Sequence, residues 1–177
     1  INTAMFSKTE GSIGIGFAIP SNMVASVVRA ATNSGIIERP WLGIGGKPLD
    51  KTLSNQLGIK ETQGLLVERV YPGSSSYNAG IKKGDIILSF NEIPIVDLSS
   101  LSYRVAISNI GEMIKLSVLR KERLVFIDLI MISAPEVPER NITQIKGDNP
   151  LSGAQIANLS PALAEELGID SLKYSKG

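Results

Sequence analysis

Two residue types are missing from this chain of 177 residues, because it contains neither cysteine nor histidine. The absence of cysteine excludes disulfide bonds, thiolate catalysis and cysteine-based zinc sites. The absence of histidine removes the usual general base and the commonest ligand of transition metals. A Ser-His-Asp or Cys-His mechanism is therefore impossible within this chain. We expect it to hold no catalytic residue, no metal site and no cofactor.

Excess charge of one sign and long hydrophobic runs are also lacking. The 18 Lys and Arg residues against 17 Asp and Glu residues give a net charge of +1, which provides no general attraction for nucleic acid. The longest apolar stretch, Leu124 to Ile132, is interrupted by Asp128 and is shorter than the roughly 20 residues of a membrane-spanning helix. We therefore expect neither nucleic-acid binding nor a membrane span.

An internal repeat is the strongest pattern in what the chain does contain. A shift of about 110 residues superimposes two segments without a gap. The matched pairs are Pro40 and Pro150, Gly43 and Gly153, Leu49 and Leu159, Leu53 and Leu163, Leu57 and Leu167, Gly58 and Gly168, and Ile59 and Ile169. In each copy a glycine turn precedes a short helix that a second glycine ends, predicted at Thr52 to Leu57 and at Ala162 to Leu167. The repeat predicts two related modules.

Between the two copies, the pattern predicts a small domain that is mainly β with short helices. Segments rich in β-branched residues predict strands at Leu65 to Val70, Asp85 to Asn91, Met113 to Leu119 and Leu124 to Ile132. A helix is predicted from about Leu98 to Asn109, opened by Asp97 or a following serine as N-cap and closed near Gly111.

The N-terminal segment predicts a separate piece of structure. Residues Ile1 to Phe6 and Ile13 to Ile19 form a hairpin-like pair, and a helix follows from about Ser21 to Gly35. Because two strands and one helix cannot bury enough surface to be stable alone, we expect them to belong to a larger domain. Since the chain begins at Ile1 without a basic leader, we expect it to be the interior of a longer polypeptide.

Three segments follow one another along the chain, namely Trp41 to Ile44, Ala79 to Ile87 and Met113 to Arg120. In order and spacing they resemble a bacterial PDZ domain of the HtrA/Deg family of serine proteases. The stretches Ile1 to Ala4 and Gly14 to Pro20 resemble the closing strands of that family's chymotrypsin-like protease domain, and Asn149 to Gly168 resembles the start of a second PDZ domain. The family's catalytic serine, histidine and aspartate have no matching positions in this chain.

The resemblance implies a fold and a division into domains. The fold is a PDZ-like, partly open β-barrel or sandwich of the α+β class, preceded by the remnant of a chymotrypsin-like β-barrel. Residues 1–35 would end the protease domain, 36–134 would form the PDZ domain, 135–147 the linker, and 148–177 part of a second PDZ domain. The proline-containing stretch Ala134 to Arg140 fits a linker by composition.

The turn around Gly43 is the candidate functional site. Successive backbone N–H groups of Leu42, Gly43 and Ile44 suit the terminal carboxylate of a peptide, and Arg39 adds long-range attraction. The strand Ile44 to Lys47 would offer an open edge for β-augmentation, opposite the helix that starts at Leu98. The remaining groove residues are Trp41, Gly45, Gly46, Lys47, Leu101, Val105 and Ser108. By residue pattern alone, the same residues are equally compatible with an ordinary turn and core filling.

The resemblance favours the groove, and implies a role and partners for the parent protein. The PDZ region would capture C-termini of misfolded proteins or peptides for a periplasmic serine endoprotease of protein quality control, as part of a homo-oligomer. In the second copy, the small residues Ser152 and Ala154 predict no independent peptide binding. The alternative is an interaction scaffold whose groove is occupied by its own or a neighbouring chain, because the N-terminal strands would expose open edges.

Overall fold

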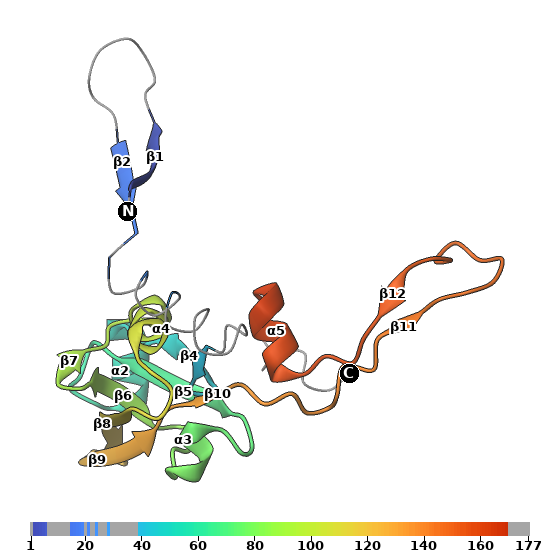
Figure 1. The fold of residues 1–177 in the computed structure, drawn as a ribbon. Coiled ribbons are helices and arrows are strands. Elements are labelled where there is room, and N and C mark those ends of the chain that lie inside the picture. Colours follow the sequence, from blue (N-terminus) through green and yellow to red (C-terminus); the bar gives the residue numbers. More distant parts are fainter. Residues whose placement is uncertain are drawn as a thin grey trace.

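A six-stranded antiparallel sheet forms the centre of the computed structural model (Figure 1). The structure describes residues 2–6, 15–19, 21, 24, 28 and 39–169. The strands follow the order β4-β5-β6-β8-β9, and β7 pairs with β6. Their bounds are β4 Ile44–Pro48, β5 Leu65–Val70, β6 Ile86–Phe90, β7 Ile93–Pro94, β8 Met113–Arg120 and β9 Arg123–Ile130. The predicted mainly-β character with short helices is confirmed, and β4 and β9 are the two ends of the sheet.

The helices are short and begin at side-chain caps. They are α2 Lys51–Leu57, α3 Ser75–Asn78 and α4 Leu98–Ile107. Asp97 caps α4 by accepting a hydrogen bond from Ser100 N, which also lowers the pKa of the Asp97 carboxyl. The predicted end near Gly111 is wrong, because α4 already ends at Ile107. Ser108 turns to an extended conformation there while its hydroxyl donates to Arg104 O at 2.9 Å.

Alternating side chains on the long β8–β9 hairpin build the core. In β8, Ile114, Leu116 and Val118 are fully buried, whereas the intervening Lys115 is exposed. The core continues through β5, β6 and α4. Its buried members are Leu42, Leu65, Val67, Ile81, Ile87, Phe90, Ile95, Leu101, Ile114, Leu116, Val118, Ile127, Leu129 and Met131.

An ion pair with a buried carboxylate connects the turn before β6 to the end of β8. Asp85 is only 2% exposed and accepts two hydrogen bonds from the guanidinium of Arg120, at 2.7 and 2.6 Å. It also accepts from Lys82 N at 2.8 Å, as expected of a carboxylate that closes a turn. The hydrogen bonds to Asp85 also raise the pKa of Arg120. Because it accepts three hydrogen bonds, the Asp85 carboxylate is satisfied within the fold.

Two short two-stranded ladders involve the N-terminal part of the chain. The strand β3, Pro40–Trp41, pairs antiparallel with β10, Ile132–Ser133, and so joins the start of the domain to its end. The predicted N-terminal hairpin is present, because β1, Asn2–Phe6, pairs with β2, Ile15–Ala18. The helix predicted from about Ser21 to Gly35 falls mostly outside the described residues.

The internal repeat is visible in matching helix ends. The helix α5, Pro161–Leu167, ends at Gly168 with φ 67°, and α2 ends at Gly58 with φ 69°. Both helices begin with a side-chain cap, from Ser160 in α5 and Asp50 in α2. The two predicted helices are therefore confirmed, each starting one residue earlier than expected.

Part of the predicted linker is joined to the second copy. Glu136 accepts hydrogen bonds from Arg140 and from the hydroxyl of Ser160, the α5 cap, and Arg140 also pairs with Glu166 at 2.7 Å. The strand β11, Thr143–Gln144, pairs with β12, Gln155–Ile156, in a hairpin that extends away from the sheet (Figure 1). Within the described ranges, no helix is long and apolar enough to cross a membrane.

Candidate functional site

The loop between β3 and β4 is held by its carbonyl oxygens. Trp41 O accepts from Ser75 Oγ at 3.4 Å, Leu42 O from Ser76 N at 3.3 Å, and Gly43 O from Tyr71 N at 2.7 Å. All three donors come from the segment 71–76, at the end of β5 and the start of α3. The three consecutive carbonyl groups therefore point to the same side of the loop, toward the segment 71–76.

The loop N–H groups consequently face the other side. In a planar trans peptide, the C=O of one residue and the N–H of the next point in opposite directions. The N–H groups of Leu42, Gly43 and Ile44 therefore point away from the segment 71–76. Among the residues described, the N–H groups of Leu42 and Gly43 donate no hydrogen bond. Such adjacent N–H groups form a concave site suited to an anion.

Glycine is required at position 43 for two reasons. Its φ of 67° lies in the left-handed region, which other residues adopt only with strain. A Cβ at this position would also overlap the Cβ of Ser74, and would lie 2.9 Å from Cη2 of Trp41. The loop conformation and its packing on Ser74 therefore both depend on the missing side chain.

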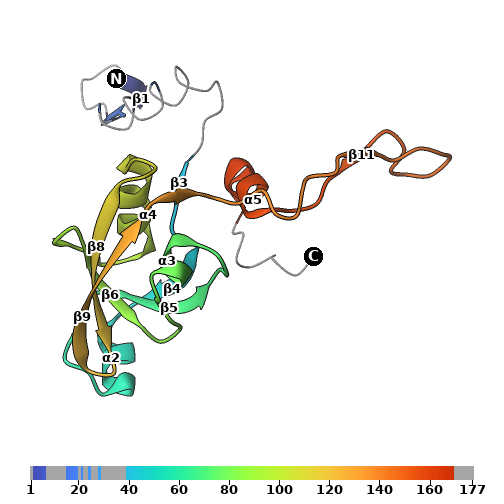
Figure 2. The ribbon, with the colours of Figure 1, turned by 60° about the horizontal axis from the view of Figure 1, so that its bottom comes forward.

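The edge of β4 continues from this loop. Tyr71 N donates to Gly43 O, so the alternation of an antiparallel ladder turns the N–H and C=O of the next residue, Ile44, to the outer edge. Among residues 39–169, no strand pairs with this edge of β4. The helix α4 lies beside it in both views (Figures 1 and 2). The loop and the unpaired edge of β4 thus lie next to α4.

Four apolar residues of the candidate site lie close together in the fold. Leu42 and Leu101 belong to one core cluster, and Ile44 and Val105 pack against it as half-buried side chains. Leu42 and Leu101 are 4% and 2% exposed, so they lie beneath the surface. Ile44 and Val105 offer the surface that a ligand side chain can contact.

The other predicted site residues have distinct positions. Arg39 is exposed beside β3, and Lys47 forms an ion pair with Glu68 at 3.1 Å. Ser108 is 6% exposed at the end of α4.

Trp41 is also 6% exposed and packs edge-on against Tyr71 with ring centroids 5.3 Å apart, so its side chain supports the loop and offers little surface. The register with β5 shifts between Gly45 and Gly46, where β5 has the additional residue Glu68, and a Cβ on Gly46 would overlap Leu66 O.

The second copy of the loop has a different hydrogen-bond pattern. Gly153 again has a left-handed φ, of 87°. Its N–H donates to Ile145 O at 2.9 Å, and Ser152 N and Ala154 N donate to Asn149 O and Leu151 O, both at 3.0 Å. All three N–H groups that correspond to the first loop are therefore bonded inside their own hairpin.

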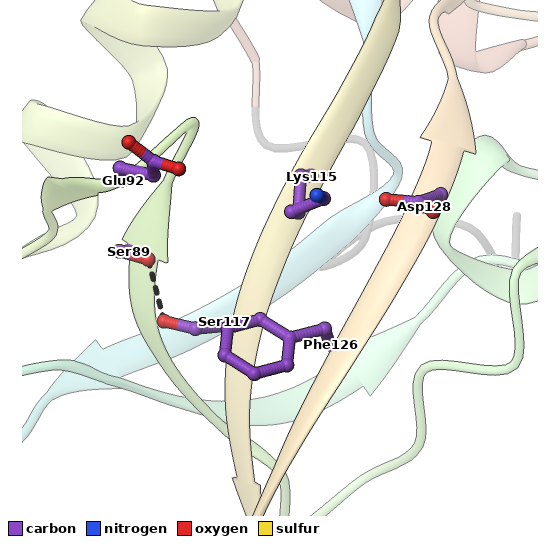
Figure 3. Close-up of a pocket in the computed structure, with 6 residues that line it drawn as sticks. All are labelled: Ser89, Glu92, Lys115, Ser117, Phe126 and Asp128. Atoms are coloured by element: carbon purple, nitrogen blue, oxygen red, sulfur yellow. Dashed lines mark hydrogen bonds between the residues drawn. The ribbon is translucent and has the colours of Figure 1, made fainter.

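A second hollow lies on the outward face of β6, β8 and β9 (Figure 3). It measures about 380 Å³ and is lined by Ser89, Glu92, Lys115, Ser117, Phe126 and Asp128. These side chains alternate along β8 and β9 with the buried core residues, so the hollow faces away from the core that carries Leu42 and Leu101. It is separate from the loop and the β4 edge.

Sequence reasoning missed the residues that hold the loop. Tyr71 and the serines Ser74, Ser75 and Ser76 lie about 30 positions away along the chain, and serine runs usually indicate an exposed turn. In the fold, all three serines are 4% exposed or less. The only signal was their position directly before the motif Ala79 to Ile87.

A protein-family model described as "PDZ domain" matches residues 40–130. The periplasmic serine endoprotease DegP of Salmonella typhimurium is 35% identical over 160 residues, which is 90% of this chain and 32% of that protein. The pH-dependent periplasmic serine endoprotease DegQ of Escherichia coli is 40% identical over 120 residues, covering 68% of this chain and 26% of that protein. The chain thus spans about a third or less of these relatives.

Solved structures give the same result. The HtrA-type protease AlgW with a decapeptide aligns at a TM-score of 0.56 and 36% identity, over 76% of this chain and 42% of that one. AlgW with a tripeptide aligns at a TM-score of 0.52 and 35% identity, over 77% of this chain and 46% of that one. The chain therefore belongs to the PDZ domain family and is a PDZ-containing region of the HtrA/DegP family.

Proposed function

We propose that this chain is the substrate-binding PDZ region of an HtrA/Deg-like periplasmic serine endoprotease and captures the C-termini of misfolded proteins. The observation that carries this proposal is the pair of N–H groups of Leu42 and Gly43, which donate no hydrogen bond to any described residue and lie beside an edge of β4 with which no described strand pairs. The AlgW structures with a decapeptide and a tripeptide support it, since they are peptide complexes of similar proteins.

Binding would use three contacts of different chemistry. The terminal carboxylate accepts charge-assisted hydrogen bonds from the loop N–H groups, which are stronger than hydrogen bonds between neutral groups. The peptide backbone adds to the edge of β4 as a further antiparallel strand. Its last side chain contacts Ile44 and Val105 above the base formed by Leu42 and Leu101, which favours apolar C-terminal residues.

We propose the following division into domains for the longer parent protein. Residues 1–35 would end the protease domain, 36–134 would form the PDZ domain, 135–147 would connect it, and 148–177 would begin a second PDZ domain. Proteolysis and protein quality control would then be activities of the longer, homo-oligomeric parent, with its catalytic residues outside this chain. Because the relatives DegP and DegQ are named periplasmic, we place the parent in the periplasm.

Isothermal titration calorimetry with matched peptides tests the binding mode. A peptide ending in valine with a free carboxylate is compared with the same peptide carrying a C-terminal amide. Charge-assisted hydrogen bonds are each worth roughly 1.5–3 kcal/mol, so amidation is expected to weaken binding tenfold or more. Equal affinity for the two peptides would exclude the carboxylate mechanism.

The scaffold alternative makes a different prediction in solution. A groove filled by a neighbouring copy requires association, so light scattering would detect a mass that rises with concentration, and free peptide would compete with it. A monomeric chain that binds peptide at every concentration would rule out this alternative.

A further inference from the structure

The hydroxyl of Ser75 lies where three parts of the fold meet. It donates to Trp41 O, at the start of the Trp41 to Ile44 loop, and accepts from Ile132 N in β10 at 3.3 Å. Trp41 and Ile132 are also cross-strand partners in the β3–β10 ladder. Ser75 itself is only 4% exposed at the first position of α3. One buried hydroxyl therefore connects the loop, β10 and α3.

The orientation of the loop depends on where its carbonyls are held. The peptide between Trp41 and Leu42 is the first of the three whose C=O faces the segment 71–76, and Ser75 Oγ is its hydrogen-bond donor from that segment. Because this peptide plane is rigid, fixing Trp41 O also fixes the direction of the N–H of Leu42. That N–H is one of the groups proposed to bind the carboxylate.

We propose that Ser75 is a positioning residue for carboxylate recognition, which acts by holding the Trp41–Leu42 peptide against β10. This inference rests on the proposed peptide-binding function. Ser75 contacts no ligand in this scheme. It keeps the N–H of Leu42 aimed into the site, so its loss lowers affinity for a free carboxylate more than affinity for an amidated peptide.

The neighbouring Ser76 provides a matched control. It is fully buried in the same turn, and its hydroxyl has no hydrogen-bond partner among the described residues. Its contact with the loop, the bond to Leu42 O, is made by the backbone N–H and is kept in alanine. Ser75→Ala and Ser76→Ala therefore each remove one buried hydroxyl next to the same loop, but only Ser75→Ala removes a hydrogen bond to it.

The experiment measures the ratio of affinities for the free-acid and amidated peptides by calorimetry, in the 177-residue chain. Ser75→Ala is expected to lower this ratio about threefold, the effect of losing one long neutral hydrogen bond, and Ser76→Ala to leave it unchanged. Ser75→Cys, which keeps the size of the side chain but replaces the hydroxyl with a weak donor, is expected to lower the ratio as well. Ser75→Thr, which keeps the hydroxyl, is expected to leave the ratio at its wild-type value.

A second measurement does not depend on the alanine variant folding. In the wild-type chain, the NMR amide signal of Ile132 is expected to shift when the free-acid peptide binds and to shift less with the amidated peptide, because Ser75 joins the two sites. An unchanged ratio in a folded Ser75→Ala or Ser75→Cys variant, or equal losses in the Ser75 and Ser76 variants, overturns the inference. If the wild-type chain itself does not distinguish the two peptides, the proposed function fails and the inference fails with it.

Discussion

Substituting Gly43 by alanine, with Gly58→Ala as its control, separates backbone strain from crowding. The two glycines have almost the same φ, 67° and 69°, so alanine should lose about 1–2 kcal/mol at either position from the left-handed conformation. Around Gly58, apart from its neighbours along the chain, no atom of the described residues lies within 4 Å of the position of an added Cβ. At Gly43, the added Cβ overlaps Ser74. The difference between the variants is therefore the effect of the overlap.

The magnitude of that effect follows from what the alanine would meet. The Cβ of Ser74 is attached directly to the backbone, and Ser74 is fully buried, so it has little freedom to move aside. Forcing an additional methyl group into a packed site costs about 1–3 kcal/mol. Gly43→Ala should thus destabilise the chain by about 2–5 kcal/mol, and Gly58→Ala by about 1–2 kcal/mol.

The binding effect should be more selective than the stability effect. The loop can relieve the overlap only by moving away from the segment 71–76, which breaks the bonds to Leu42 O and Gly43 O and turns the N–H groups out of the site. We expect Gly43→Ala to lower affinity for a free-acid peptide tenfold or more and to remove the preference for it over the amide. Gly58→Ala, at the end of α2, should leave both affinities unchanged.

Urea unfolding gives the two free energies, and calorimetry below the unfolding transition gives the affinities. The reasoning is refuted if the two variants are equally destabilised and the Gly43→Ala variant still prefers the free acid. That result would mean that the loop accommodates a side chain without reorienting its N–H groups.

Three further predictions concern the supporting structure. Arg120→Met should destabilise the chain by about 3–5 kcal/mol in urea unfolding, because it leaves the buried carboxylate of Asp85 unpaired. Leu101→Ala should cost about 2–5 kcal/mol in the same assay, since this side chain is 2% exposed. The hydrogen bond from Arg140 lowers the pKa of Glu136, so the stability from this contact is present above the ordinary carboxyl pKa and is lost as the pH falls through the lowered value. The protection of α5 amides from hydrogen exchange, relative to their intrinsic rate at each pH, should therefore fall in acid, and Glu136→Gln should remove the part of this change that comes from Glu136.

Several elements around the candidate site could be predicted from sequence, because their signals are local. The β-branched residues of β8, the cap signal around Asp97 and the repeated glycine turns are each contained in a few consecutive residues, and each gave the right element. The end of α4 was misjudged because glycine at position 111 is a stronger general signal than the serine at 108, whose hydroxyl bonds back to Arg104 O. A single side-chain hydrogen bond of this kind has no distinctive sequence pattern.

The anchoring of the loop could not be predicted, because it depends on distant residues. The repeat makes this clear, since Gly43 and Gly153 occupy corresponding positions and both have a left-handed φ. In the first copy, donors from the segment 71–76 hold the carbonyls, and the N–H groups of Leu42 and Gly43 stay unbonded among the described residues. In the second copy, the N–H groups bond to carbonyls within residues 145–151.

A glycine turn is therefore not sufficient to make an anion site in this fold. Its N–H groups become available only where another segment binds the carbonyls on the opposite side of the same peptide planes. In the first copy that segment is the end of β5 and the start of α3, and Ser75 further attaches it to β10. On this reasoning, the residues that decide whether such a turn binds a carboxylate are the donors behind it, and variants of those donors are the most direct way to test the proposed function.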